Sequence, residues 1–235
     1  MTQRVSLHYA AVPSQLVESL EAEWLPRLPA PKAAAIRRLR VVADRNASLL
    51  GIALLGAACA ELGAEFDPAA LEYPDYGKPQ LRGGPNFSIS HTRGLVACAA
   101  AASGRVGLDI ETSGSVTARV AERILSPGER AAVERGVLSS TDAWVMKEAV
   151  VKLAGRSIGA LEAVALEAQR ATLEGEGYWL ESVALAAARA TLAGAGYWLE
   201  PVALPVGFVA WLASDVPTRR VSVHAAAAAP LPTRR

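Results

Sequence analysis

The sequence is poor in cysteine and nearly balanced in charge. Two of its 235 residues are cysteine, and no CxxC or Cys/His cluster is present, so neither a disulfide framework nor a cysteine-ligated zinc site is indicated. Cys59 and Cys98 each lie in an apolar run, which predicts small buried thiols in a reducing compartment. The 24 Lys and Arg residues face 23 Asp and Glu residues, and without a basic excess we expect no nucleic-acid partner.

Long apolar runs are also missing. The N-terminal segment lacks the apolar centre of a secretory leader, and the apolar stretches fall well short of the roughly 20 residues that a membrane-spanning helix needs. We therefore expect a cytoplasmic protein with no membrane partner. Since domains commonly have about 100–150 residues, the length suits one large domain or two small ones.

The N-terminal part reads as helical. Leu16, Leu20 and Trp24 recur at helical spacing within 14–25, and a second, long helix is expected over 31–63. The first half of that helix is basic and its second half is almost wholly apolar, as in a helix buried within a larger fold. Residues 67–85 are rich in proline and glycine, which predicts a loop.

Three strands, three helices and further strands are expected after this loop. The strands are predicted at 86–90, 94–101 and 105–111, the helices at 117–124, 127–135 and 140–154, and the later strands near 161–166, 178–185, 197–204 and 207–213. Residues 170–185 recur almost unchanged at 189–204, and the segments GLVACAAA and GFVAWLAS resemble each other. This second likeness hints at two similar halves.

Two acidic residues in the segment VGLDIE share one face of a predicted strand. Asp109 and Glu111 are two positions apart, so their side chains point the same way. Adjacent carboxylates repel, and a cation between them would explain the pattern; oxygen ligands favour Mg²⁺. The alternative is an ordinary exposed strand end.

Glu148 and Lys152 are four positions apart in WVMKEAVVKLAG. On a helix they form a favourable surface ion pair, which is the simpler interpretation. The functional hypothesis places the Glu148 carboxylate at the same cation as Asp109 and Glu111.

Polar residues at a strand end and on the preceding loop are further candidates. Ser88 and Ser90 share a face in NFSISHT, His91 begins the turn, and Lys78 lies in GKPQL. These side chains could contact a phosphate-bearing ligand, or be a turn histidine and a solvated loop lysine. No GxSxG, Walker or GxGxxG motif is present, so a serine hydrolase, a nucleoside triphosphatase and a dinucleotide enzyme are unsupported.

The order of these motifs is more specific than any one of them. GKPQL, NFSISHT, VGLDIE and WVMKEAVVKLAG, with LSPGER at 125–130, resemble the 4′-phosphopantetheinyl transferase superfamily, and the length favours its long surfactin-type branch. The resemblance covers about 30–158. It implies an α+β fold in which two similar αβ halves form a pseudo-dimer, with the active site in the cleft between them and a monomer sufficient for activity. The halves would be 1–104 and 105–224, followed by a flexible tail at 225–235.

The resemblance also implies a reaction. The phosphopantetheine arm of coenzyme A would move to a serine of an apo acyl or peptidyl carrier protein, with Mg²⁺, or Mn²⁺ in its place, as cofactor and adenosine 3′,5′-bisphosphate as the other product. The metal ligands would be Asp109, Glu111 and Glu148. The catalytic residues would be Glu148 and Lys152, with Lys152 stabilising charge on the leaving phosphate. The residues at the coenzyme would be Lys78, Ser90, His91, Arg37, Arg45 and Lys147, and Lys32 and Arg38 belong to the same basic run.

Several alternatives stay open from the sequence. The base that takes the serine proton could be Glu148, Glu111 or a metal-bound water. The same carboxylates would suit a Mg²⁺-dependent phosphohydrolase acting on coenzyme A or nucleotides, which would release phosphopantetheine without a carrier. A non-catalytic module that binds coenzyme A or carriers, and a purely structural α+β domain, are the remaining readings. Carrier docking is expected at Arg119, Arg123 and the apolar 116–138 region.

Overall fold

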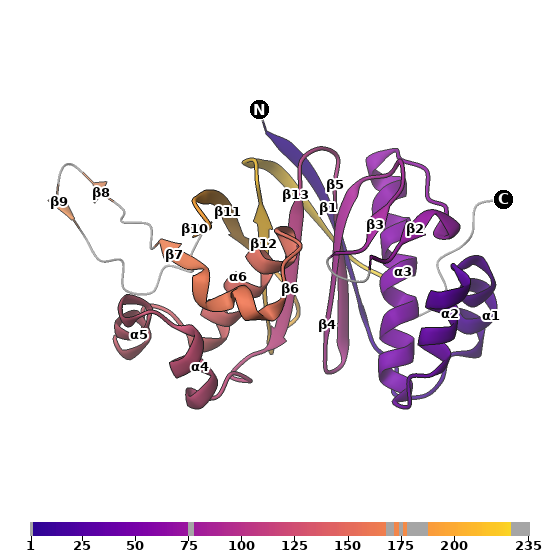
Figure 1. The fold of residues 1–235 in the computed structure, drawn as a ribbon, viewed down its shortest axis with the longest axis horizontal. Coiled ribbons are helices and arrows are strands. Elements are labelled where there is room, and N and C mark those ends of the chain that lie inside the picture. Colours follow the sequence, from indigo (N-terminus) through magenta and orange to yellow (C-terminus); the bar gives the residue numbers. More distant parts are fainter. Residues whose placement is uncertain (1, 75–77, 168–171, 174–175, 178–187, 227–235) are drawn as a thin grey trace.

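The computed structural model describes residues 2–74, 78–167, 172–173, 176–177 and 188–226. Two main sheets dominate the fold, which is α+β (Figure 1). The first sheet has the order β13-β1-β5-β4 and the second has the order β6-β12-β11-β10-β7. The first consists of β13 (Thr218–Ala225), β1 (Gln3–Ala11), β5 (Leu95–Ala101) and β4 (Asn86–Thr92). The second consists of β6 (Val106–Thr112), β12 (Phe208–Ser214), β11 (Ala195–Pro201), β10 (Ala188–Leu192) and β7 (Ala165–Glu167).

Helices and short hairpins complete the fold. The helices are α1 (Glu18–Trp24), α2 (Ala30–Arg37), α3 (Val42–Leu62), α4 (Ala118–Ile124), α5 (Pro127–Glu134) and α6 (Ser140–Leu153), with 3₁₀ turns η1 (Leu25–Arg27), η2 (Pro68–Ala70) and η3 (Ile158–Ala163). The hairpins are β2 (Leu71–Glu72) with β3 (Gln80–Leu81), and β8 (Thr172–Leu173) with β9 (Glu176–Gly177).

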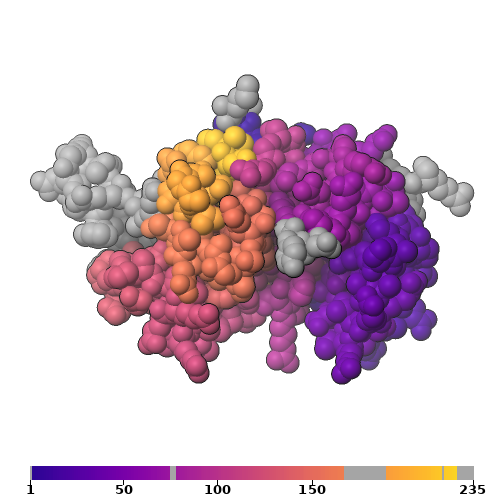
Figure 2. Space-filling model, in the orientation of Figure 1, coloured from indigo at the N-terminus to yellow at the C-terminus, as the bar shows by residue number. Residues whose placement is uncertain are grey.

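The core has four layers. Helix α3 covers the outer face of the first sheet and helix α6 covers the outer face of the second, each over its own apolar cluster. Between the sheets, Val5 and Leu7 of β1 share a third cluster with Leu108 and Ile110 of β6. Figure 2 shows the two sides of the molecule, indigo to purple and orange to yellow, meeting on one face. The inner faces of both sheets are therefore buried against each other.

The long helix expected over 31–63 is interrupted. Helix α2 ends at Arg37 and α3 begins at Val42. The guanidinium of Arg45 donates to the backbone carbonyls of Leu39 and Arg37, which satisfies carbonyl groups that a continuous helix would have paired internally. The single-helix prediction was therefore wrong at this point.

Helix α3 passes a length and composition test for crossing a membrane, the one helix among the described residues to do so. An apolar run of this length was not predicted from the sequence, because Asp44, Arg45, Asn46 and Ser48 interrupt it near its start. A buried core helix passes the same test, and 61% of the window lies inside the protein. Cys59 of α3 and Cys98 of β5 are both free and buried, as predicted.

Several strands were missed, among them β1, β13, β10 and the short β2 and β3 within the predicted loop, and one segment was assigned wrongly. The terminal strands β1 and β13 pair in parallel in the first sheet, although no strand was expected at either segment. The strand predicted near 161–166 is mostly the 3₁₀ turn η3, followed by the short β7. The predicted strand at 178–185 lies outside the described residues, and its repeat at 189–204 forms the β10–β11 hairpin.

Candidate active site

Strands β4 and β6 join the two sheets through side chains. The backbone N–H groups of Val106, Leu108 and Ile110 donate to Asn86 Oδ1, Ser88 Oγ and Ser90 Oγ over 3.0, 2.9 and 3.3 Å. The constant spacing means that the two strands run in parallel, side by side in the middle of Figure 1. Residues two apart share a strand face, so the serines of NFSISHT form the seam between the sheets.

Helix α6 lies directly on β6 because residue 107 is glycine. A Cβ built at Gly107 would lie 1.9 Å from the carbonyl oxygen of Ala149 and 2.5 Å from the backbone nitrogen of Leu153, so any side chain there would push the helix away. The register of α6 is also fixed at its start, where Ser139 Oγ accepts from the backbone N–H of Asp142 over 2.9 Å. This packing brings the last turns of α6 over Asp109.

Lys152 and Asp109 meet at this crossing. Lys152 Nζ lies 2.5 Å from Asp109 Oδ1, 3.0 Å from Ser90 Oγ and 3.9 Å from Glu148 Oε2. Ser90 Oγ in turn donates to Asp109 Oδ1 over 2.8 Å. The ion pair expected between Glu148 and Lys152 is therefore present, and Lys152 makes its shorter contact with Asp109.

The three predicted metal-ligating carboxylates form one electrostatic cluster. Burial raises the pKa of Asp109, which is 4% exposed, against the opposing effect of Lys152. Burial also raises the pKa of Glu148, with repulsion from Asp109 and Glu111 adding to it. Glu111 accepts from Thr92 Oγ1 over 3.0 Å. The carboxylates are therefore held close enough to disfavour one another's charge.

These donors fit a hard divalent cation. Asp109 Oδ2 is buried and has no hydrogen-bond partner among the described residues, although a buried carboxylate oxygen normally has one. An oxygen-only donor set with excess negative charge is the preference of Mg²⁺. The orphaned oxygen and the like-charge cluster are both what a cation at this place would relieve.

A cavity of about 310 Å³ opens beside the cluster. Its walls come from α3, the β2–β3 hairpin, β4 and the end of α6. The charged and polar residues that line it are Lys32, Ser48, Tyr73, Lys78, Ser88, His91, Lys152 and Arg156. A cavity with apolar walls and several cationic groups suits a ligand that carries both an apolar part and phosphates.

Lys78 is part of the cavity wall. Its ammonium donates to Asn86 Oδ1 over 2.7 Å and to the carbonyl of Val106 over 2.5 Å, and burial lowers its pKa to about 7. The loop lysine is thus inserted between β4 and β6 rather than solvated. Gly77 of the GKPQL motif lies outside the described residues.

The expected coenzyme residues divide into two groups. His91 and Lys78 line the cavity, whereas Ser90 lies next to Lys152 and Asp109. Arg45 does not line the cavity: it pairs with Glu21 at 3.2 Å and is held there by the end of α2.

Arg37 and Lys147 are also not among the cavity residues. Arg37 is exposed in the last turn of α2. Lys147 is fully buried and pairs with Glu129 at 2.9 Å, with a further hydrogen bond to the carbonyl of Val164. Adjacent helix positions point in different directions, so Lys147 faces the core while Glu148 faces Asp109. Lys147 is therefore a correction to the site expected from the sequence, whereas Arg37 and Arg45 stay predictions that lie outside this cavity.

Among the polar residues that line the cavity, Ser48, Tyr73 and Arg156 were not expected. Tyr73 lies against Lys32, whose ammonium is 4.7 Å from the ring centroid. Arg156 follows Gly155, which takes a left-handed conformation (φ 64°) after α6 ends. The glycine after the helical pattern was the available signal, since it marks a turn that redirects the next side chain.

Comparison with known proteins finds the same family in a family model and in two relatives. Residues 105–189 match the family model of the 4′-phosphopantetheinyl transferase superfamily. The chain is 31% identical over 147 residues to a 4′-phosphopantetheinyl transferase of Bacillus subtilis, covering 59% of this chain and 65% of that protein. It is 33% identical over 135 residues to the 4′-phosphopantetheinyl transferase psf-1 of Bacillus pumilus, covering 54% and 58%. The chain thus spans less than two thirds of each relative.

The resemblance carried by the motifs is confirmed. The segment matched by the family model holds β6 and α6, and these two elements supply all three carboxylates.

Proposed function

We propose that this protein transfers the 4′-phosphopantetheine arm of coenzyme A to a serine of an apo acyl or peptidyl carrier protein. The observation that carries the proposal is the convergence of Asp109, Glu148 and Lys152 beside a cavity lined by further cationic side chains. The similarity to two proteins named 4′-phosphopantetheinyl transferases supports the same reaction. A phosphohydrolase and a coenzyme-binding module would need the same residues. Only the identity of the reaction product distinguishes these alternatives from a transferase.

Asp109, Glu111 and Glu148 would hold Mg²⁺, or Mn²⁺ in its place. The bound ion would neutralise charge on the pyrophosphate of coenzyme A. Lys152 lies against the same carboxylates and would stabilise the charge that develops on the departing phosphate. His91 and Lys32 line the cavity and would bind the other phosphate oxygens of the coenzyme.

The reaction balances without a redox partner. The carrier serine oxygen bonds to the phosphorus that bears the pantetheine arm, and the bond from that phosphorus to the bridging oxygen breaks. Adenosine 3′,5′-bisphosphate leaves with the electron pair, and the serine proton goes to a base. We assign the base to Glu148, because Glu111 already accepts from Thr92 and Ser115.

The two sides of the molecule support a pseudo-dimer. Each consists of a sheet covered by one helix, α3 or α6, and the parallel strands β4 and β6 meet where they join. We divide the chain at 1–104 and 105–224, with β13 returning to the first sheet. The cavity takes residues from β4 and from the end of α6, so one chain would complete the active site as a monomer.

Carrier docking would use the outer surface of the second half. Arg119 and Arg123 are exposed on α4, and Arg123 lies 3.9 Å from Glu162 in an exposed ion pair. An acidic carrier surface would suit these groups. Charge reversal of both arginines should raise the KM for the carrier and leave the KM for coenzyme A unchanged; an unchanged carrier KM would remove this part of the proposal.

Intact-mass analysis tests the reaction itself. The protein is incubated with coenzyme A and apo carrier proteins of fatty-acid, polyketide and peptide synthesis, with Mg²⁺ or with EDTA. We expect a Mg²⁺-dependent mass gain of one phosphopantetheine arm on a carrier serine. Free phosphopantetheine formed without a carrier would instead establish the phosphohydrolase. Coenzyme A binding without either product would favour a binding module or a narrow preference for another carrier.

A further inference from the structure

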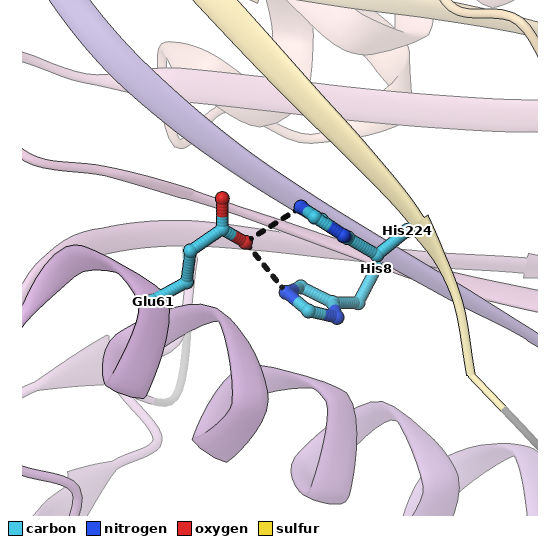
Figure 3. Close-up of side chains that lie close together, drawn as sticks. All are labelled: His8, Glu61 and His224. Carbon is cyan, nitrogen blue, oxygen red and sulfur yellow. Dashed lines mark hydrogen bonds and ion pairs between the residues drawn. The ribbon is translucent and has the colours of Figure 1, made fainter.

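A second polar cluster lies on the other side of the first sheet, away from the carboxylates. Strands β1 and β13 pair in parallel with Ser6 opposite Ser222 and His8 opposite His224. These alternate positions share the face that α3 covers. Glu61, in the last turn of α3, points at both histidines (Figure 3). Three elements that are distant in sequence thus deliver two imidazoles and a carboxylate to one point.

The geometry of the cluster is close to that of a metal site. Glu61 Oε2 lies 3.1 Å from His8 Nε2 and 2.8 Å from His224 Nε2, and the three ligand atoms all lie within 4.8 Å of one another. A tetrahedral cation with bonds of about 2.0–2.1 Å separates its ligand atoms by about 3.3–3.4 Å. The rings of His8 and His224 are stacked with their centroids 4.7 Å apart, so they would have to tilt toward each other for both Nε2 atoms to reach one ion.

We propose that His8, Glu61 and His224 bind Zn²⁺. Two imidazole nitrogens and one carboxylate oxygen are a set that zinc accepts, with water as the fourth ligand. Mg²⁺ does not compete well for such a site, because it prefers oxygen ligands. When zinc is bound, each ring carries its proton on Nδ1 and presents Nε2 to the metal.

The surroundings support this assignment. Ser6 Oγ donates to Glu61 Oε2 over 2.6 Å and so orients the carboxylate, as residues around metal ligands commonly do. The side chains of His8, Glu61 and His224 are 13%, 31% and 45% exposed, which leaves a path for the ion and room for a water ligand.

Nearby charges both attract and repel a cation at this cluster. Burial alone would raise the pKa of Glu61, but hydrogen bonds from Ser6, Ser222 and His224 lower it to about 2, so the carboxylate is charged at neutral pH. Arg4 and Arg220 occupy the next positions on the same strand face and oppose a cation. The guanidinium of Arg4 is turned to the carbonyl of Leu62 at 3.3 Å, which limits this repulsion.

Zinc at this cluster would attach the C-terminal strand to the helix that forms the cavity. β13 is an edge strand that pairs only with β1 in the described part of the sheet, whereas α3 lines the cavity through Ala47, Ser48 and Ile52. A metal bound between them would stabilise the folded state by mass action. The effect does not depend on the transfer reaction, so it can be measured separately from it.

Equilibrium dialysis against Zn²⁺ in a large excess of Mg²⁺, with the metal counted by mass spectrometry, tests the site. We expect about one zinc per chain in the wild type, and a loss of affinity of at least about 10–100-fold in His224→Ala and in Glu61→Gln. His224→Ala is the primary variant, because the residue is exposed on an edge strand and its removal leaves the core intact. Zinc should raise the melting temperature of the wild type and not that of His224→Ala.

Two controls separate this site from the carboxylate cluster. His91→Ala removes the third and last histidine of the chain, and Asp109→Ala removes a carboxylate of the other site; both should keep zinc binding. With Co²⁺ as a probe, the visible absorption of a four-coordinate, nitrogen-ligated ion should appear in the wild type and vanish in His224→Ala. Absence of zinc uptake, equal uptake by His224→Ala, or loss of uptake in Asp109→Ala would each overturn the proposal.

Discussion

Lys152 of α6 donates to Asp109 of β6 over 2.5 Å, and this contact joins the two elements that carry the proposed metal ligands. The ammonium satisfies one oxygen of the aspartate and leaves the other, Oδ2, buried without a partner in the described part of the chain. A buried charge with an unused acceptor is costly for a purely structural ion pair. It is expected where a second cation completes the site.

Asp109→Asn tests that interpretation with little change in shape. The amide oxygen can still accept from Ser90 and Lys152, but the negative charge for Mg²⁺ is gone. We expect the rate of phosphopantetheine transfer to fall by about 100-fold or more, while the melting temperature in EDTA equals or exceeds that of the wild type. Initial rates by intact mass and thermal melts check both. A variant that retains the wild-type rate would remove Asp109 from the metal ligands.

The stabilisation by Mg²⁺ should depend on pH. The folded-state pKa values of Asp109 and Glu148 lie above 3.8 and 4.5, so the metal-free folded state holds these protons more tightly than the unfolded chain. That contribution to stability is complete below about pH 4 and is lost as the pH rises through the raised values. Mg²⁺ binds the carboxylates in their ionised form. At higher pH its binding therefore restores the stability that the metal-free protein loses with these protons.

The increase in melting temperature caused by Mg²⁺ should therefore grow between about pH 4 and about pH 8. Melts in Mg²⁺ and in EDTA at matched ionic strength measure it. An increase that is the same at both ends of this range would show that the ion stabilises the protein elsewhere.

Gly107→Ala should displace α6. The added Cβ would meet the carbonyl oxygen of Ala149 at 1.9 Å, and overpacking of this kind costs about 1–3 kcal/mol or more. Because the displaced helix carries Glu148 and Lys152, the transfer rate of the remaining folded protein should also fall. Gly128→Ala in α5 is the matched control, since no atom of the described residues lies within 4 Å of the Cβ that it adds. Equal unfolding free energies for both variants in urea would contradict the close packing.

Lys147→Met should lower the free energy of unfolding and leave the affinity for coenzyme A unchanged. The substitution leaves the buried carboxylate of Glu129 without its partner at 2.9 Å, and breaking such a pair costs about 3–5 kcal/mol. The double variant Lys147→Met with Glu129→Gln should recover part of this loss, because no buried charge remains. Urea unfolding measures both. If Lys147→Met keeps its stability and instead raises the KM for coenzyme A, Lys147 belongs in the site after all.

Local periodicity was enough to find many of the elements. The predicted strands at 86–90, 94–101 and 105–111 correspond to β4, β5 and β6, and the three predicted helices correspond to α4, α5 and α6. β1 and β13 escaped prediction, because neither is followed by a hairpin partner in the chain and they pair with each other across nearly its whole length. Their alternating patterns, RVSLHY and RVSVHA, were visible but carry little weight without a neighbouring turn signal.

The sequence by itself determined which side chains share a face, because backbone geometry sets side-chain direction over a few residues. It determined that Asp109 and Glu111 share one face of a strand and that Glu148 and Lys152 share one face of a helix. Only the tertiary structure decided which faces meet: Lys152 reaches Asp109 because α6 packs on β6 at Gly107. The same packing buries Lys147, and strand pairing brings His8 beside His224. Contacts between distant segments depend on the packing of whole elements, which short-range periodicity does not contain.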